Sequence, residues 1–176
     1  WAPRLHAEYF DYSKRVDAKY PEVPRNWRKS VFPMACFNMG RNVVCFRHRD
    51  IMNVPYGWCA ITALGRFDHR RSACLVLWEL GLFFEFPHGT TMYLPSASIT
   101  HSNTELVGPE EERGSFTQYF PGFLLRFVDN NFMTDKELKV HSPSVFADLA
   151  VWKRDRWQRG LEKLSTLQEV LDRLSN

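Results

Sequence analysis

The sequence predicts an α+β fold: a double-stranded β-helix, or jelly roll, that lies between N-terminal and C-terminal helices. Short β-rich runs punctuated by Gly and Pro fill the middle of the chain, and helical periodicity occurs on either side of them. The β-rich runs follow one another at hairpin-like spacing, which favours antiparallel strands in two layers over alternating βαβ units.

The length and composition are those of one folded domain. A chain of 176 residues is about one domain long, and its 44% hydrophobic and 15% aromatic residues exclude a mainly disordered chain. We expect a single domain over 1–176, with an N-terminal helical segment at 1–30, the jelly-roll core at 31–120 and C-terminal helices at 121–176. Because the first residue is Trp1, we expect this domain to be excised from a longer protein.

The N-terminal helix is predicted over residues 4–19, where apolar side chains recur at helical spacing among charges. Pro21 and Pro24 then end the pattern. Eight β-rich runs follow, with Gly or Pro between them, and we expect strands at 31–37, 42–48, 57–64, 74–79, 82–86, 90–94, 97–101 and 114–120.

Beyond Pro121 the pattern is helical again. Helices are predicted over 123–132 and 145–156, and a final helical segment carries leucines three and four residues apart between Leu161 and Leu174. Too few heptads follow for a coiled-coil seam, so we expect this segment to pack on its own domain and the protein to be a monomer.

Net charge, cysteine content and the lack of long apolar stretches limit which partners, metal sites and cellular locations are expected. A net charge of +3 with a pI near 8.7 is compatible with a polyanionic partner, although many ordinary domains are as basic. Four cysteines lie in apolar stretches without a CxxC pair, so we expect reduced core thiols and no zinc site. Neither a signal peptide nor a stretch of about 18 apolar residues occurs, which favours an intracellular protein with no membrane partner.

His48 and Asp50 are the first candidate ligands for a metal ion. In an extended strand, side chains two residues apart point to the same face, so these two can converge on one ion. Imidazole plus carboxylate is the ligand set expected for non-haem Fe(II) when a second histidine completes a facial triad. The motif is weak alone, because chance gives about 0.3 His-x-Asp occurrences in a chain of this composition.

The third ligand is expected on a later strand that pairs with the first. His101 lies 53 residues after His48, at the end of a predicted strand. His88 is the alternative, but it lies in a Pro-His-Gly turn, where an exposed hairpin residue is the more natural interpretation. The pair His6 and Glu8 is disfavoured, because positions two apart on a helix diverge by roughly 200°.

Arg113 and Ser115 favour His101 and indicate a co-substrate. Both follow His101 and share one face of an extended strand. A guanidinium fork plus a hydroxyl suits the distal carboxylate of a dicarboxylate, held by bidentate charge-assisted hydrogen bonds. The alternative is a surface arginine that merely follows the acidic run Glu110–Glu112. The ordered set His-x-Asp, His, Arg-x-Ser favours a 2-oxo acid that chelates the metal ion through its other end.

Three segments resemble the TET/JBP branch of the 2-oxoglutarate and Fe(II)-dependent oxygenases, particularly its versions in mushroom-forming fungi. They are Phe46–Asn53, which contains the motif His-Arg-Asp-Ile, together with Ser98–Asn103 and Arg113–Ser115. The resemblance covers residues 30 to 130 and leaves both helical ends unassigned.

The resemblance implies a set of ligands and a reaction. Three residues would be the ligands of Fe(II): His48, Asp50 and His101. Two would anchor 2-oxoglutarate: Arg113 and Ser115. O₂ would be the other co-substrate. Arg41 is a further candidate for 2-oxoglutarate, at its keto-acid end, with Arg47 as the alternative.

The resemblance also implies a nucleic-acid substrate. Asn53 would contact the target base and Tyr119 would stack on it, since a base must leave the duplex to reach a metal centre inside a barrel. Relatives that oxidise 5-methylcytosine often carry a histidine two positions beyond the stacking ring, where this chain has Pro121. 5-Methylcytosine and N6-methyladenine in DNA are therefore both open as substrates, and we expect a nuclear protein. Candidate phosphate contacts are Arg25, Arg28, Lys29, Arg66, His69, Arg70 and Arg71.

Other functions fit parts of the pattern. The same barrel and ligands would serve a 2-oxoglutarate-dependent hydroxylase of a protein or small-molecule substrate. A cupin-like metalloenzyme would use His48 and His101 but leave Arg113 unexplained. A non-catalytic nucleic-acid-binding module would not need intact metal ligands. Asn53 and Tyr119 also have simpler interpretations, as a turn residue and a core residue.

Overall fold

The computed structural model describes residues 2–25 and 27–175, which divide into two compact units. One unit is Phe32–Pro121 and contains every strand of the described residues, whereas the other joins Trp1–Val31 to Gly122–Asn176 and is helical. Both borders lie one residue beyond those predicted between the β core and the helical ends. The mixed α+β class is confirmed, and the single domain stays a prediction.

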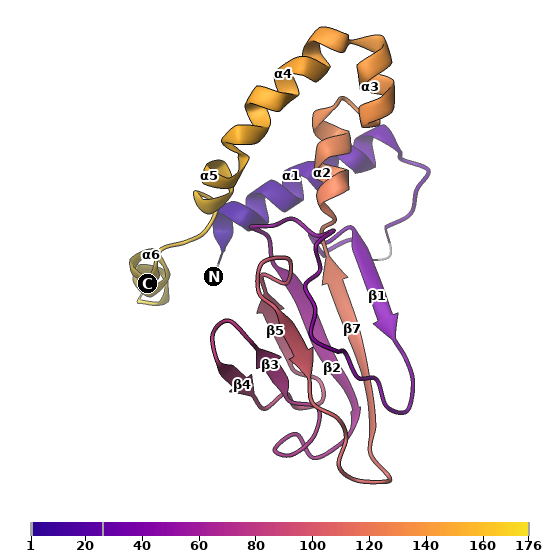
Figure 1. The fold of residues 1–176 in the computed structure, drawn as a ribbon, viewed down its shortest axis with the longest axis vertical. Helices are drawn as coiled ribbons and strands as arrows, with labels where there is room; N and C mark the ends of the chain where they lie inside the picture. Colours follow the sequence, from indigo (N-terminus) through magenta and orange to yellow (C-terminus); the bar gives the residue numbers. More distant parts are fainter. Residues whose placement is uncertain (1, 26, 176) are drawn as a thin grey trace. The chain divides into compact units, whose positions relative to one another are not determined.

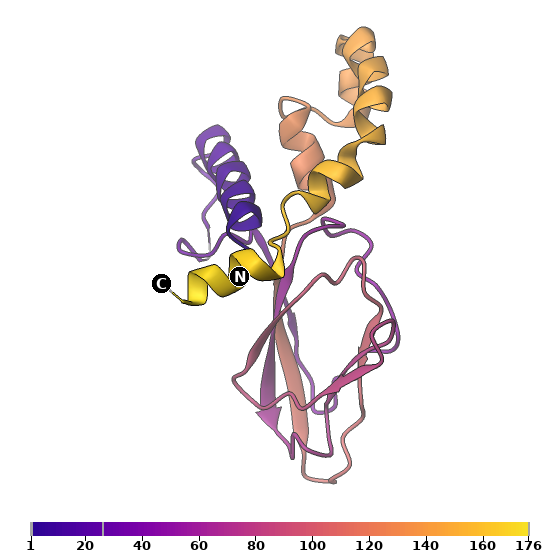
Figure 2. The same cartoon turned by 90° about the vertical axis from the view of Figure 1, so that its left-hand side faces the viewer.

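The β unit holds two antiparallel sheets (Figure 1). The larger sheet has the strand order β1-β7-β2-β5 and the smaller has β4-β3-β6. In the turned view the two sheets are separate layers (Figure 2). Antiparallel pairing in two layers agrees with the prediction, and closure into a jelly roll stays a prediction. The strands are β1 (Met34–Asn38), β2 (Cys59–Arg66), β3 (Leu75–Leu77), β4 (Leu82–Phe84), β5 (Thr91–Leu94), β6 (His101–Asn103) and β7 (Glu112–Tyr119).

The strand predicted at 42–48 does not form. This segment makes isolated bridges instead, from Asn42 to Arg113 of β7 and from His48 to His101 of β6. Because it hydrogen-bonds first to the larger sheet and then to the smaller one, it runs beside neither strand long enough for a ladder. The prediction of a strand is therefore wrong here, and the segment links the two sheets.

The strand predicted at 97–101 begins only at His101. The residues before it form a turn in which the backbone N–H groups of Ser98 and Ile99 both donate to Pro95 O at 3.0 Å. Proline and serine favour such a turn over a strand. His101 consequently opens β6, and its side chain is buried.

The core of the β unit is shared by both sheets and follows the period of two expected of strands. Burying one large apolar side chain contributes about 1.5–3 kcal/mol, so this cluster holds the two layers together. Its buried members are Cys59, Ile61 and Ala63 of β2, Leu75 and Leu77 of β3, Phe86, and Leu94 of β5.

Gly65 lets β2 and β7 approach closely near the end of the sheet. Its φ of +127° lies in a region that side chains rarely adopt, and a Cβ there would stand 2.1 Å from Glu112 O. Its register partner on β7 is Arg113. A glycine is therefore required beside the residue that the sequence marks as a carboxylate anchor.

The helical unit contains a helix that the prediction missed. Thr134 and Glu137 form a capping box at the start of α3, in which each side chain accepts from the other's backbone N–H. A second capping box, Thr166 with Glu169, begins α6 and interrupts the final predicted helix. None of the helices in the described ranges combines the length and apolarity that a bilayer crossing needs. The helices are α1 (Pro3–Lys19), α2 (Gly122–Asp129), α3 (Asp135–His141), α4 (Pro143–Arg154), α5 (Arg156–Leu161) and α6 (Leu167–Leu174).

The four cysteines are all free thiols, but not all of them are core residues. Cys59 and Cys74 are buried, and burial raises the pKa of the Cys59 thiol to about 11. Cys45 is half-buried and Cys36 is exposed. The prediction of four core thiols is wrong for Cys36, because β1 is an edge strand of the larger sheet.

Candidate metal centre

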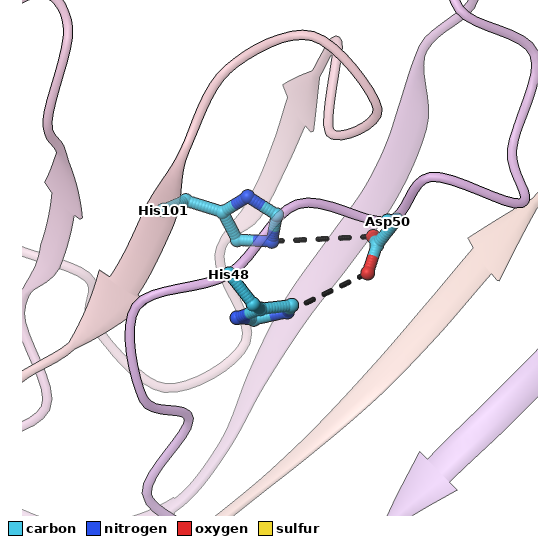
Figure 3. A group of neighbouring side chains, drawn as sticks. All are labelled: His48, Asp50 and His101. Carbon is cyan, nitrogen blue, oxygen red and sulfur yellow. Dashed lines mark ion pairs between the residues drawn. The ribbon is translucent and has the colours of Figure 1, made fainter.

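Three side chains of the β unit converge in the way a metal centre requires (Figure 3). The potential ligand atoms of His48, Asp50 and His101 all lie within 4.8 Å of one another. The Nε2 atom of His48 is 3.5 Å from Asp50 Oδ1, and the Nε2 atom of His101 is 3.9 Å from Asp50 Oδ2. The structure thus brings together all three predicted ligands.

The main chain holds the three residues in place. His48 N donates to His101 O at 3.0 Å, and His101 N donates back to His48 O at 2.9 Å. Asp50 N donates to Ser96 O at 2.9 Å. Since both histidines belong to one backbone bridge, the separation of their rings is set by the fold.

Hydrogen bonds fix the tautomer of both histidine rings. The Nδ1 atom of His48 lies 2.7 Å from Phe46 O, and that of His101 lies 3.0 Å from Ile99 O. A carbonyl oxygen only accepts, so each Nδ1 carries the proton and each Nε2 turns a lone pair toward Asp50. Two lone pairs facing one carboxylate are the donor set that a divalent transition-metal ion takes. The residues present therefore fit Fe(II).

Burial keeps His101 in the form a metal needs. Desolvation lowers the pKa of His101 below its ordinary value of 6.5, and the nearby His48 adds to this effect. The Ile99 carbonyl and Asp50 act in the opposite direction. The neutral imidazole, which is the form that binds metal ions, is thereby favoured.

A cavity of about 460 Å³ adjoins the three residues. Alternate residues of β7 point into it, as expected for one face of a strand. Of the eight predicted site residues, seven line this cavity: His48, Asp50, Asn53, His101, Arg113, Ser115 and Tyr119.

Arg113 is a buried cation that has no acidic partner among the described residues. Its side chain is only 3% exposed, its Nη1 donates to Val43 O at 2.8 Å, and its Nε has no hydrogen-bond partner. Burial lowers the pKa of its guanidinium below the ordinary value for arginine. A buried charge is costly without a counter-ion, so this group favours an anion in the cavity.

Ser115 lies beside Arg113 with its hydroxyl already oriented. The side chain is 2% exposed, and its Oγ accepts from Asn38 Nδ2 at 3.0 Å. Asn38 is also the register partner of Ser115 across β1 and β7. Because Asn38 donates, the hydroxyl proton of Ser115 is left to donate to an anion.

Asn53 contacts the Asp50 carboxylate as well as lining the cavity. Its Nδ2 donates to Ser96 Oγ at 3.2 Å and lies 3.5 Å from Asp50 Oδ2. Tyr119 is half-buried, lines the cavity and packs against the apolar core. Both predicted base contacts therefore line the same cavity as His48, Asp50 and His101.

Several predicted residues lie elsewhere. The Arg41 side chain is 76% exposed, is 3.5 Å from Glu112 and does not line the cavity. The Arg47 guanidinium lies over the ring of Trp78, 4.7 Å from its centre. His88 is exposed in its turn, where Nδ1 accepts from the backbone N–H of Gly65. The structure therefore does not bring these three side chains to the cluster.

The predicted phosphate contacts are spread over both units. None of the seven lines the cavity. Arg66, Arg70 and Arg71 are exposed in the β unit, whereas Arg25 belongs to the helical unit and pairs with Asp17 at 3.2 Å. Their contact with phosphates stays a prediction.

Sequence reasoning missed the polar residues that support the cluster. Asn38 orients Ser115, and the Asn103 side chain accepts from Cys45 N at 2.7 Å. Ser96 receives hydrogen bonds from both the Asp50 backbone and the Asn53 side chain. Of these residues only Asn103 could have been found from the sequence, because it lies two residues beyond the predicted ligand His101 and so shares its strand face.

No protein-family model matches the chain, and no curated protein matches it in sequence. Among solved structures, the chain is similar to NgTET1 in complex with 5mC DNA, with a TM-score of 0.46 and 12% sequence identity. The match covers 62% of this chain and 43% of the NgTET1 chain, so this chain spans less than half of that one. A likeness at this level carries no function with it, because one fold serves many chemistries.

Proposed function

We propose that this chain is a 2-oxoglutarate and Fe(II)-dependent dioxygenase. One observation supports the proposal: the His48, Asp50 and His101 cluster shares its cavity with Arg113, a buried guanidinium without an acidic partner among the described residues. A His/Asp/His set would hold Fe(II), which together with a 2-oxo acid and O₂ would supply the oxidising chemistry. Arg113 and Ser115 supply the counter-charge and the hydroxyl for the distal carboxylate.

The chain's own residues would bind and orient the reactants. The two Nε2 atoms and the Asp50 carboxylate would hold Fe(II), while the Nδ1 hydrogen bonds keep both rings turned inward. When bound, the iron centre supplies oxidising chemistry that converts O₂ and 2-oxoglutarate to succinate and CO₂ and places one oxygen atom in a substrate C–H bond. Asn53 would steady the carboxylate through its amide.

The proposed substrate is a methylated base of DNA, taken from the stack into the cavity. Tyr119 offers a ring for stacking and Asn53 an amide, both on the cavity wall. Pro121, which pairs with Asn53 in an isolated bridge, has no N–H to read a base edge. This leaves 5-methylcytosine and N6-methyladenine both as candidates. We further propose a jelly-roll core of the fungal TET/JBP type, a monomer and a nuclear location.

Mass spectrometry of nucleosides tests the proposal. Iron-loaded protein is incubated with 2-oxoglutarate, O₂ and DNA that carries both methylated bases, and succinate is measured alongside. Hydroxymethylcytosine is expected from the first base, and adenine plus formaldehyde from the second, because a hydroxylated N-methyl group decomposes. Asp50→Ala is expected to abolish succinate formation. Succinate without any oxidised base, and turnover on methyl-bearing peptides instead, would identify a protein hydroxylase.

A further inference from the structure

Ile51 and Met52 occupy the two central positions of a β-turn that begins at Asp50 and ends at Asn53. The turn is closed by a hydrogen bond from Asn53 N to Asp50 O at 2.9 Å. Both side chains are exposed, Ile51 by 79% and Met52 by 64%. Turn centres favour Gly, Pro, Asn, Asp and Ser, so the turn itself does not call for two large apolar residues. Burial against the described residues does not account for them either.

The turn is fixed at both ends. Asp50 N donates to Ser96 O at 2.9 Å, and the Asn53 side chain donates to Ser96 Oγ at 3.2 Å. On the far side, Val54 N donates to Phe120 O at 3.0 Å. A tip anchored in this way keeps its position when it is pressed against a ligand.

The turn lies at the rim of the candidate active site. Ile51 and Met52 are exposed and also line the cavity that holds Asp50. The same segment carries Arg47, an exposed guanidinium that stacks on Trp78 and has no acidic partner among the described residues. A segment that carries both an apolar tip and an exposed cation suits a nucleic acid, which presents stacked bases and phosphates.

We propose that Ile51 and Met52 are a wedge that enters a nucleic-acid duplex and fills the gap left by the base in the cavity. This inference rests on the proposed function and makes the duplex the preferred form of its substrate. Unstacking a base costs free energy, and apolar side chains inserted between base pairs offset that cost. A single strand has no stack of base pairs with a gap to be filled, so the wedge contributes less to base extrusion from a single strand.

The first test measures base extrusion without turnover. Anaerobic protein loaded with Fe(II) and 2-oxoglutarate is added in saturating amounts to a duplex that carries 2-aminopurine at the target position. Fluorescence of this base rises when it leaves the stack, and we expect a rise with the wild type. With the double variant Ile51→Ser/Met52→Ser, the rise is expected to be about tenfold smaller. Phe83→Ser is the matched control, because Phe83 is 58% exposed and does not line the cavity.

The second test compares the oxidation rates of one methylated base in a duplex and in a single strand. The ratio of duplex rate to single-strand rate is expected to fall about tenfold in the double variant and to stay unchanged in Phe83→Ser. Met52→Leu, which keeps an apolar tip, is expected to retain the wild-type ratio. Melting temperatures verify folding, and the single serine variants replace the double variant if it is unfolded.

The outcomes of these tests distinguish a failure of the wedge proposal from a failure of the proposed dioxygenase function. An undiminished fluorescence rise in the double variant, or an equal loss in Phe83→Ser, overturns the wedge, as does the absence of any rise with the wild type. A wild-type protein that extrudes the base but oxidises none when O₂ is admitted supports the wedge and removes the proposed function.

Discussion

The backbones of His48 and His101 form a reciprocal pair, in which each N–H donates to the other's carbonyl oxygen at 3.0 and 2.9 Å. Their rings lie with centroids 4.3 Å apart, and a backbone carbonyl holds each Nδ1. Residues 53 positions apart in the sequence are thereby joined as one unit. The main chain, and not the flexibility of long side chains, sets the spacing of the two ligand nitrogens, which favours a single coordination geometry.

His101→Ala is expected to abolish Fe(II) binding, because it removes one of three donors that face each other within 4.8 Å. His88→Ala is the matched control, since His88 is exposed in a turn outside the cavity lining. Iron content after anaerobic loading, together with the visible absorption band of the iron complex with 2-oxoglutarate, measures the effect. Equal iron content in the two variants would remove His101 from the ligand set.

Arg113→Gln is expected to weaken 2-oxoglutarate binding about 100-fold, because it removes the buried charge that is proposed to pair with the distal carboxylate. Iron binding in the absence of 2-oxoglutarate is expected to persist. Arg41→Gln serves as the control and should change the dissociation constant by less than about twofold, since that side chain is 76% exposed. Titration of 2-oxoglutarate into the iron-loaded protein gives both constants. Equal losses in the two variants would contradict the assignment of the anchor to Arg113.

Asn53→Ala is expected to lower the affinity for Fe(II) about tenfold, because the amide no longer steadies the Asp50 carboxylate. The measurement is made without nucleic acid, so a residue that only reads the base would leave the affinity unchanged. Asn42→Ala, at an exposed asparagine of the same unit, is the control.

The ionised carboxylate of Glu111 is expected to stabilise the folded protein at neutral pH, but not in strong acid. Its carboxylate accepts hydrogen bonds from Asp68 N, Ser72 Oγ and Gly108 N, which lower its pKa from the ordinary 4.5 to about 2. Because the folded-state pKa is the lower one, the contribution is present above 4.5 and is lost as the pH falls through about 2.

Glu111→Gln is accordingly expected to melt below the wild type at neutral pH, with a difference that shrinks between pH 4.5 and about 2. Thermal denaturation followed by circular dichroism across this range measures the difference. Glu110→Gln, at the exposed neighbour, is expected to melt with the wild type at neutral pH. A constant difference at every pH would show that the glutamine acts through packing instead of charge.

The candidate ligand pair and the candidate anchor pair could be predicted from the sequence because each pair is a local pattern. His48 and Asp50 are two residues apart, Arg113 and Ser115 are two residues apart, and the order of these pairs along the chain is visible. The missed support residues depend on strand pairing. Asn38 reaches Ser115 across 77 residues, and only the register of β1 against β7 brings them together. Propensity says nothing about register.

The failed strand at 42–48 has a similar cause. Its valines, cysteine and phenylalanine favour an extended chain, but a ladder also needs one neighbour that runs alongside. This segment exchanges hydrogen bonds with β7 and then with β6. By contrast, the start of α6 could have been predicted, because the Thr166 and Glu169 capping box is a local signal.

If the His48, Asp50 and His101 cluster holds the proposed Fe(II), the backbone bridge between the two histidines would couple metal binding to folding. An unfolded chain still holds His48 and Asp50 as neighbours, but His101 joins them only when the linking segment pairs with β6. An ion that binds the native chain more tightly than the unfolded one stabilises it by mass action. With Fe(II) bound as proposed, the loaded protein would then unfold less readily, and resist proteolysis better, than the metal-free protein.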